Sequence, residues 1–213
     1  MRNIRKTFVL AVLATALAGC AGGKGKIAPE AVQKPPWPPA PAESVQLSPE
    51  QEMVKQVLAK NGYGSLGPFP TILVVHKQTR RLTVYRGLTP VKTYPVVLGR
   101  NPVGDKLCQG DLCTPEGVYR VVTKFEHPRW SKFILLDYPN TQNWLKYAEA
   151  KRKGRIPYDA EIGGQVGIHG TDDPYKNLAG ENWTWGCVSL LNNHIEELYP
   201  LVNEKTLIII TKN

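Results

Sequence analysis

From about residue 69 onward, hydrophobic and polar residues alternate in short runs along the chain. These runs are rich in β-branched residues and are separated by glycine, proline and asparagine turns, which is typical of strands. The predicted strands cover residues 71–75, 81–85, 92–98, 117–123, 132–136 and 205–211. Short strands separated by turns predict a mainly β domain, a sandwich or barrel, with short inserted helices.

Three stretches show helical spacing instead. Ser48 has the character of a helix cap and is followed by Pro49 and two polar residues, as at a helix N-terminus. The apolar positions that follow at helical spacing are Met53, Val54, Val57 and Leu58. Further helices are predicted at residues 141–153 and 193–203, and in the second the apolar residues fall on one face.

The first 46 residues have a different composition. Basic residues near the N-terminus precede an apolar run over residues 8–18, which is too short to span a membrane and is typical of an export signal. The following Leu17-Ala18-Gly19-Cys20 resembles the lipobox of bacterial lipoproteins and implies a lipid on Cys20. An ordinary secretory signal is the alternative. Residues 20–46 are rich in proline and predict an extended tether.

These boundaries predict four segments. They are a lipoprotein signal peptide (1–19), a lipid-anchored tether (20–46), a short helical lead-in (47–66) and a catalytic domain (67–213). Ala21, and not an aspartate, follows the cysteine, which resembles lipoproteins sent to the outer membrane. The expected location is therefore the periplasm of a Gram-negative bacterium, with the lipid on Cys20 anchoring the protein to the outer membrane.

The charge balance narrows the choice of partners. Lysine and arginine number 27 against 18 acidic residues, a formal net charge of +9. Excess positive charge outside the cytoplasm suits an anionic polymer or a membrane surface. No zinc finger, RNA-binding signature or long basic run accompanies the charge, so nucleic acid is not an expected partner.

The cysteines divide by role. Cys108 and Cys113 lie close together in a Gly/Asp-containing loop, where they would form a small disulfide in an oxidising compartment or remain two free thiols. No further ligands cluster near them, so no metal site is expected. Cys187 is left unpaired, which is unusual in an exported protein.

Cys187 and His169 carry the candidate chemistry. Cys187 follows His169 by 18 residues, and each residue adjoins a glycine. A thiol attacks as the thiolate, and a neighbouring imidazole is a common way to generate one. Gly186 lets the backbone turn sharply and direct N–H groups at a developing oxyanion. If the two side chains meet, the chain is a cysteine acyl-transfer enzyme.

These residues resemble the L,D-transpeptidase catalytic domain (YkuD-type). The matching segments are Ile168-His169-Gly170, Thr184-x-Gly186-Cys187-Val188, Leu98-Gly-Arg-Asn-Pro-x-Gly104 and Thr114-Pro-Glu-Gly117-Val-Tyr119. The similarity runs from about Thr71 to Thr211. The resemblance implies a mainly β, antiparallel β-sandwich-like fold with short inserted helices, in agreement with the strand pattern.

The resemblance also implies roles for individual residues. Cys187 would be the nucleophile, His169 the base, and the backbone carbonyl of Gly170 would hold the imidazole in its productive tautomer. The N–H groups of Gly186 and Cys187 would form the oxyanion hole. Neither an organic cofactor nor a metal is implied, because acyl transfer by a thiol needs none.

Substrate contacts follow from the same comparison. Thr184 matches the Ser/Thr position of the family motif, whereas Trp185 stands where the family has histidine, and Ser189 replaces an arginine or asparagine near the acyl-donor pocket. Trp183 and Trp185 would flank the entrance of the cleft. The segment with Tyr138 and Asn140 resembles the family's substrate-side loop, although simple turn chemistry explains it equally well.

Three functions remain open from the sequence. The first is an L,D-transpeptidase, in which Cys187 attacks the diaminopimelate–D-Ala bond of a peptidoglycan stem peptide and an amine accepts the acyl group. The second is a hydrolase with the same Cys/His pair, either an L,D-carboxypeptidase or an enzyme that releases a wall-linked lipoprotein. The third is a non-catalytic wall-binding lipoprotein. The expected partners are peptidoglycan stem peptides, a wall-linked lipoprotein in the second case, and the membrane through the lipid on Cys20.

Overall fold

The computed structural model describes residues 46–64 and 69–212. The predicted signal peptide, the lipid site at Cys20 and nearly all of the proline-rich tether lie outside these residues and stay predictions. Among the helices of the described part, none combines the length and the apolar character needed to cross a membrane.

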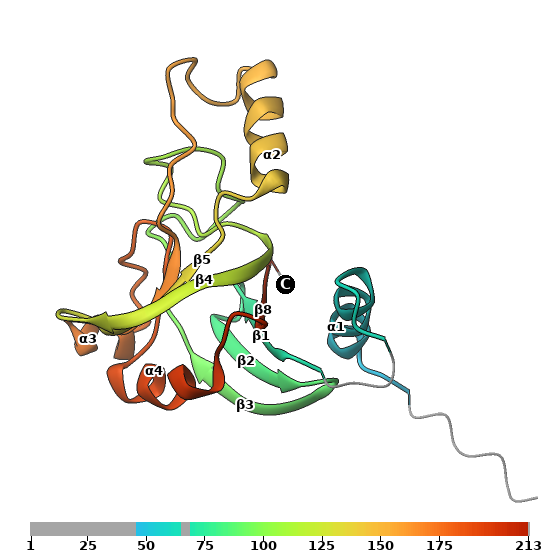
Figure 1. Ribbon diagram of the computed structural model, residues 1–213. Helices are drawn as coiled ribbons and strands as arrows, with labels where there is room; N and C mark the ends of the chain where they lie inside the picture. Colours follow the sequence, from blue (N-terminus) through green and yellow to red (C-terminus); the bar gives the residue numbers. More distant parts are fainter. Residues whose placement is uncertain (1–45, 65–68, 213) are drawn as a thin grey trace, which may run out of the picture. The chain divides into compact units, whose positions relative to one another are not determined.

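Eight strands form one curled sheet in the order β3-β2-β1-β8-β4-β5-β6-β7. The strands are β1 (Thr71–His76), β2 (Arg81–Arg86), β3 (Thr89–Pro95), β4 (Gly117–His127), β5 (Ser131–Leu136), β6 (Gly167–His169), β7 (Val188–Ser189) and β8 (Leu207–Thr211). The mainly β fold is confirmed (Figure 1). Most neighbouring strands pair antiparallel, as expected. The sheet is nevertheless mixed, because β8 pairs with β1, and β7 with β6, in parallel.

The long strand β4 bends the sheet over its own core. Its first residues, 117–120, pair with β8, and after a register irregularity at Val121/Thr123 the remainder pairs with β5. An irregularity of this kind increases local twist and bends a strand. Val97, just after β3, forms an isolated β-bridge with Ser189 of β7. The first and last strands of the sheet, β3 and β7, therefore approach each other. One buried cluster, which includes Tyr94, Tyr119 and Ile134, fills the interior.

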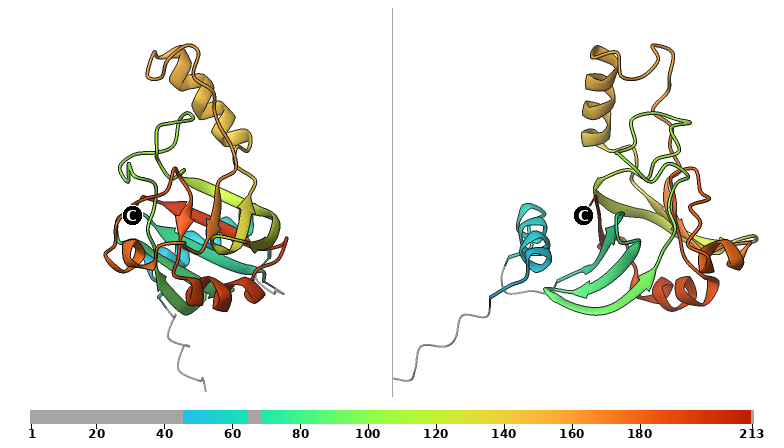
Figure 2. Two further views of the ribbon diagram at one scale, coloured as in Figure 1. Left: turned by 90° about the vertical axis from the view of Figure 1, so that its left-hand side faces the viewer. Right: turned by 180° about the vertical axis from the view of Figure 1, so that it is seen from behind.

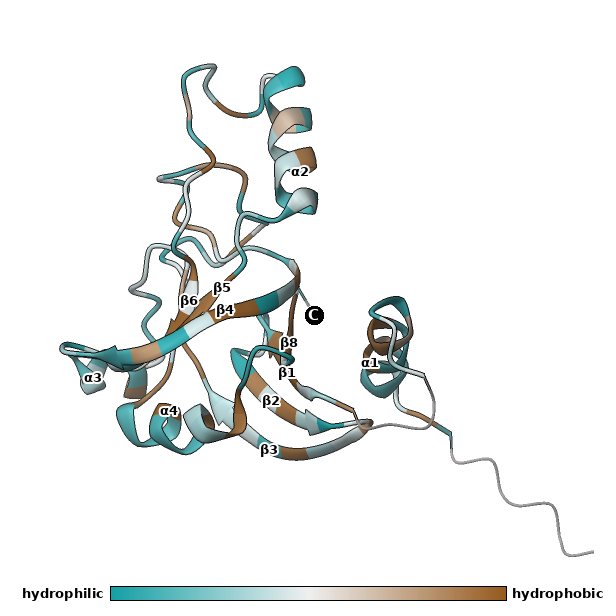
Figure 3. Cartoon of the chain, viewed as in Figure 1, coloured by the Kyte–Doolittle hydropathy of each residue, from teal (hydrophilic) through white to brown (hydrophobic). Residues whose placement is uncertain are grey.

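The helix α1 (Pro49–Lys60) lies in the predicted lead-in segment and forms as expected. Ser48 and Gln51 make a reciprocal capping box that satisfies two backbone N–H groups at the helix start. Val54 and Leu58 are buried against side chains of β1, β2 and β8 on the face of the sheet opposite the main core. Figure 3 shows hydrophobic residues on these strands and on part of α1.

The remaining helices cover the ends of the sheet or project from it. The sequence anticipated α2 (Thr141–Arg152) and α4 (Asn192–Leu198), which continues into the short 3-10 helix η1 (Tyr199–Leu201), but not α3 (Pro174–Leu178). Ile195 and Leu198 of α4 are buried in the main core. By contrast, α2 and the chain that follows it connect β5 to β6, and this segment extends beyond the sheet (Figures 1 and 2).

Candidate active site

The parallel pair β6 and β7 brings the segments of the predicted nucleophile and base together. Ile168 pairs with Val188, and both side chains are fully buried in the core. Because side chains alternate along a strand, His169 points to the face opposite Ile168. Cys187 lies immediately before β7, and its Sγ accepts the N–H of Gly167, the first residue of β6, at 3.4 Å. The backbone thus brings the Cys187 thiol to the strand that carries His169.

The imidazole of His169 is buried and held in one orientation. Its Nδ1 lies 2.6 Å from the carbonyl oxygen of Gly170. A carbonyl only accepts hydrogen bonds, so Nδ1 carries the proton and Nε2 is left as the basic nitrogen. The ring stacks on Trp130, with centroids 4.3 Å apart, and on Phe133 at 5.5 Å. Burial lowers the pKa of His169 to about 4.

A chain of hydrogen bonds fixes the carbonyl that holds the histidine. The Ser189 hydroxyl donates to the Gly170 oxygen at 2.9 Å, and the Asn177 amide donates to the Ser189 hydroxyl at 3.1 Å. The Gly170 N–H donates to the Trp130 carbonyl at 3.0 Å. A Cβ on Gly170 would lie 2.4 Å from that carbonyl oxygen, so only glycine fits here.

Backbone groups and burial act on the thiol of Cys187. Besides accepting the Gly167 N–H, its Sγ donates to the Gln165 carbonyl at 3.6 Å. Burial raises the pKa of Cys187 to about 11, against smaller opposing contributions from the Gly167 N–H and from Lys106. Burial thus favours the neutral forms of both Cys187 and His169.

The turn before the nucleophile requires Gly186. Its φ is +135°, and a Cβ there would lie 2.8 Å from the Cys113 carbonyl oxygen. Thr184 braces the turn, because its hydroxyl donates to the Cys187 carbonyl at 2.7 Å and accepts the Gly186 N–H at 3.2 Å. The Gly186 N–H is therefore engaged in this structure and would have to leave Thr184 to reach an oxyanion.

The sequence comparison decides the family. Residues 70–210 match YkuD, the L,D-transpeptidase catalytic domain. The chain belongs to this family. No curated protein sequence matches it. Members of the L,D-transpeptidase family act on peptidoglycan stem peptides, which is the substrate class expected from the motifs.

Solved structures agree on the fold. The chain is similar to the helical cell shape determining protein Pgp2 from Campylobacter jejuni, with 21% identity over 76% of this chain and a TM-score of 0.50. A mutant of the same protein matches with 22% identity over 78% of this chain and a TM-score of 0.51. An L,D-transpeptidase from Mycobacterium smegmatis matches with 13% identity over 66% of this chain and 58% of its own, with a TM-score of 0.43. This chain spans about 55% of the first Pgp2 structure and 57% of the second.

Two residues expected on the substrate side of this L,D-transpeptidase domain have structural roles. Tyr138 is 5% exposed, and its hydroxyl donates to the Ile162 carbonyl at 3.2 Å. Asn140 caps α2, because its side-chain oxygen accepts the N–H groups of Gln142 and Asn143. The two residues anchor the ends of the segment between β5 and β6, and contact with substrate stays a prediction.

The other expected contacts divide by exposure. Thr184 and Ser189 are buried and bond to the backbone of Cys187 and Gly170, so in this structure they support the backbone around the predicted catalytic residues. Trp183 is half-buried, with its ring edge towards His169 and its Nε1 donating to Asn177. Trp185 is 76% exposed beside the nucleophile and stays the strongest candidate for substrate contact.

Three residues around the site had no signal in the sequence. Trp130 and Phe133 stack on the histidine from the β4–β5 hairpin, and Asn177 reaches Ser189 from α3. An aromatic residue in a hairpin or an asparagine in a short helix is common in any domain. Only the tertiary structure shows that Trp130 and Phe133 stack on the imidazole and that Asn177 reaches it indirectly, through Ser189 and the Gly170 carbonyl.

The loop before β4 packs under the Gly186 turn and holds both remaining thiols. Cys108 and Cys113 are buried and free, so the disulfide that the sequence left open is not formed in this structure. Asp111 accepts the N–H groups of both cysteines and pairs with the buried Lys106 at 2.7 Å. Burial opposes ionisation of Asp111, but these contacts outweigh it and lower its pKa.

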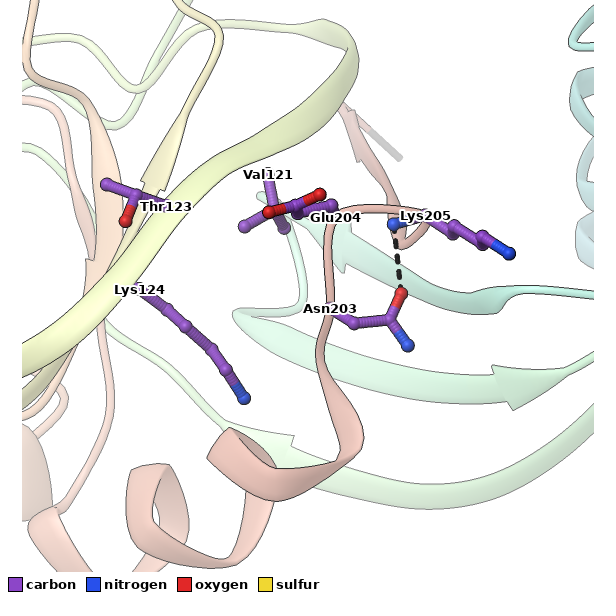
Figure 4. Close-up of a pocket in the computed structure, with 6 residues that line it drawn as sticks. All are labelled: Val121, Thr123, Lys124, Asn203, Glu204 and Lys205. Carbon is purple, nitrogen blue, oxygen red and sulfur yellow. Dashed lines mark hydrogen bonds between the residues drawn. The ribbon is translucent and has the colours of Figure 1, made fainter.

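Neither a metal cluster nor the surface hollow beside β4 adds to the site in the described part of the chain. Among the described residues, no group of three or more His, Cys, Asp or Glu side chains is arranged to hold a metal ion. A hollow between β4 and the turn before β8 is lined by Val121, Thr123, Lys124, Asn203, Glu204 and Lys205 (Figure 4). None of these residues belongs to the predicted site, so the hollow offers no place for the chemistry of Cys187.

Proposed function

We propose that this protein is a cysteine acyl-transfer enzyme of the cell wall, an L,D-transpeptidase that cleaves the diaminopimelate–D-Ala bond of stem peptides. One observation carries the proposal. His169 is oriented by the Gly170 carbonyl with Nε2 as its basic nitrogen, and the Cys187 thiol accepts the N–H of Gly167, two residues earlier on the same strand. That arrangement supplies a nucleophile, a base and an orienting group without a carboxylate.

The proposed reaction has two half-steps. As Sγ of Cys187 bonds to the peptide carbonyl carbon, its proton passes to Nε2 of His169, and an oxyanion forms. Collapse of this intermediate breaks the C–N bond, and His169 returns the proton to the departing D-Ala amine, which leaves a thioester on Cys187. An acceptor amine then attacks the thioester, loses its proton to His169 and releases the thiol.

The acyl acceptor distinguishes the transpeptidase from its hydrolytic alternative. Water in place of the amine would convert the same intermediate into a tripeptide, or would detach a wall-linked lipoprotein. The difference depends on how well the acyl-enzyme excludes water. The fold is shared with a protein named for determining helical cell shape. Altered cell morphology on deletion of the gene is therefore an informative readout beside product analysis.

Product analysis tests the proposal directly. The full-length protein is incubated with diaminopimelate-type tetrapeptide muropeptides, with and without an added D-amino acid, beside Cys187→Ala and His169→Ala. Crosslinked or exchanged products that both variants lack are expected. Tripeptides alone would identify the hydrolase, in which case lipoprotein-linked muropeptide is the next substrate. No product from any of these substrates would refute the enzymatic function.

We also propose that the protein is exported and anchored through Cys20 to the outer membrane. The lipobox-like segment and the proline-rich stretch after it support this location. Cells fed a labelled fatty acid should incorporate the label into the wild-type chain and not into Cys20→Ala. Recovery of the wild-type chain as an unlabelled, membrane-free protein would reject the anchor and leave the acyl-transfer proposal untouched.

A further inference from the structure

The segment between β5 and β6 displays aromatic side chains that no part of the catalytic machinery uses. Trp144 is 51% exposed and Tyr158 is 94% exposed, although large aromatic rings are usually sheltered. Exposed apolar side chains that gather in one place mark interaction sites more often than chance exposure.

Printed contacts join these rings into one continuous strip. Trp144, Tyr147 and Lys151 follow one another on α2 at spacings of three and four residues, so they share a face of the helix. Trp144 packs edge-on against Tyr147, with ring centroids 5.6 Å apart. Lys151 contacts two rings, with Nζ 4.9 Å from the Tyr147 centroid and 5.6 Å from that of Tyr158, and its Nζ donates to the Tyr158 carbonyl at 2.6 Å. We call Trp144, Tyr147, Lys151 and Tyr158 the aromatic strip.

The surroundings of the aromatic strip are basic. Residues 141–162, which contain the whole strip, include five lysines and arginines and three acidic residues, Glu149, Asp159 and Glu161, a net charge of +2. Glu149 is paired with Arg152 and Lys153, and Lys146 is paired with Asp105. A partner with negative charge is therefore favoured. A lysine that contacts the rings interrupts the wide apolar stripe that insertion into a membrane requires. A polymer that offers both ring-sized apolar faces and carboxylates fits the strip better.

The same segment also reaches the reacting thiol. Gln165, near its end, contacts Sγ of Cys187 through its carbonyl. At its root, Tyr138 and Ile162 are joined by a hydrogen bond, and Glu161 accepts the Gln109 N–H from the loop under the active site. A polymer bound along α2 is thereby held at a defined position relative to Cys187.

We propose that the aromatic strip binds the glycan strand of peptidoglycan, a polysaccharide that carries the anionic stem peptides. Sugar rings would stack on Trp144 and Tyr158, and free carboxylates of the attached peptides would pair with Lys151. The inference rests on the proposed function, because it assigns the strip to the polymer that bears the substrate. It is separable from catalysis, since the strip contains none of the reacting groups.

Equilibrium binding tests the aromatic strip without turnover. Full-length protein with Cys20→Ala and Cys187→Ala, which removes both the lipid anchor and the nucleophile, is co-sedimented with purified sacculi. Adding Trp144→Ala with Tyr158→Ala should weaken binding to sacculi about tenfold. Adding Lys151→Ala instead should weaken binding less, and should make the affinity less dependent on salt concentration. Trp144→Phe, which retains a ring, should keep most of the binding. Val91→Ala, at a 47% exposed position on β3, and Lys60→Ala, in the last turn of α1, are matched controls.

The outcomes separate this inference from the proposed function. If the strip variants bind sacculi as well as the parent protein does, the inference is overturned, even if the enzyme is active. Loss of binding to anionic phosphatidylglycerol vesicles, with sacculus binding intact, would also overturn it and assign the strip to a membrane. On the chain that retains Cys187, the strip variants should process soluble tetrapeptide normally and intact sacculi slowly. If the parent protein binds sacculi through the strip yet processes neither substrate, the proposed function fails and the inference stands.

Discussion

The opposite pKa shifts of Cys187 and His169 set the resting state of the site. Burial raises the first to about 11 and lowers the second to about 4, so both groups are neutral between about pH 5 and pH 10. Alkylation of Cys187 by iodoacetamide, measured against a Cys187→Ala background, should be slow at pH 7 and rise about tenfold per pH unit towards pH 11. Activity should fall on the acid side as pH drops through about 4, when His169 becomes protonated. A fast, pH-independent alkylation near neutrality would instead indicate a preformed thiolate–imidazolium pair.

Ser189 acts on the reaction through the Gly170 carbonyl. Ser189→Ala removes two hydrogen bonds, one donated to the Gly170 carbonyl and one accepted from the Asn177 amide, each worth about 1 kcal/mol, and loosens the group that orients His169. We expect kcat to fall about 3- to 10-fold with KM nearly unchanged. Thr206→Val is the matched control, because it removes the buried hydroxyl that accepts the Asn203 N–H far from the site. Equal losses of kcat in both variants would show that general destabilisation, and not positioning, is responsible.

Trp130 helps to position His169, because the two rings are stacked. The indole is stacked on two imidazoles. Its ring centroid lies 4.3 Å from that of His169 and 4.4 Å from that of His127. Such a stack is worth about 0.5–1.5 kcal/mol, so Trp130→Leu should lower kcat/KM about 2- to 10-fold and Trp130→Phe less. Opening the site to water should also raise the pKa of His169, because burial is what lowers it. The groups that bear on this titration are His127 and Asp172. An unchanged acid limb in Trp130→Leu would contradict the role.

At the scale of elements, the turn that leads into β7 depends on two properties of Gly186. The residue has a positive φ, and its Cα lies against the Cys113 carbonyl. Gly186→Ala should therefore lose activity. It should also lower the free energy of unfolding by more than the roughly 1–2 kcal/mol that a left-handed backbone conformation costs by itself. Gly62→Ala is a control for the strain, since Gly62 has a φ of +82° with nothing within 4 Å of a built Cβ. Thermal unfolding and kcat/KM check both variants, and similar effects in the two would rule out the close contact as the cause.

At the scale of the whole molecule, α1 belongs to the same cooperative unit as the sheet. Leu58 is 3% exposed and packs with residues of β1 and β8. Leu58→Ala should lower the free energy of unfolding by about 2–5 kcal/mol, as for other buried leucines. Urea denaturation measures this change, with the exposed Lys55→Ala as control. A separate early transition in Leu58→Ala, with the main transition unmoved, would show that α1 unfolds independently of the domain.

Local patterns were sufficient for most of the elements. The strands from Thr71 to Leu136 and the final strand follow from β-branched runs between turns, and α1 follows from its cap and its apolar spacing. These signals act over a few residues and are visible in the chain itself. The strands β6 and β7 were missed because they have three and two residues, too few for a periodic pattern, and exist only through pairing with β5 and with each other.

The His-Gly and Thr-x-Gly-Cys segments are contiguous and chemically specific, so they were enough to identify the family and to predict the reactive pair. Only the tertiary structure decided what surrounds that pair. It showed that Ser189 and Thr184 support backbone groups, that Trp130 and Asn177 join the site, and that the rings of α2 form one exposed strip. The reason is physical: a side chain's chemistry is written in the residue type, whereas its burial and partners depend on strands and loops that are distant along the chain.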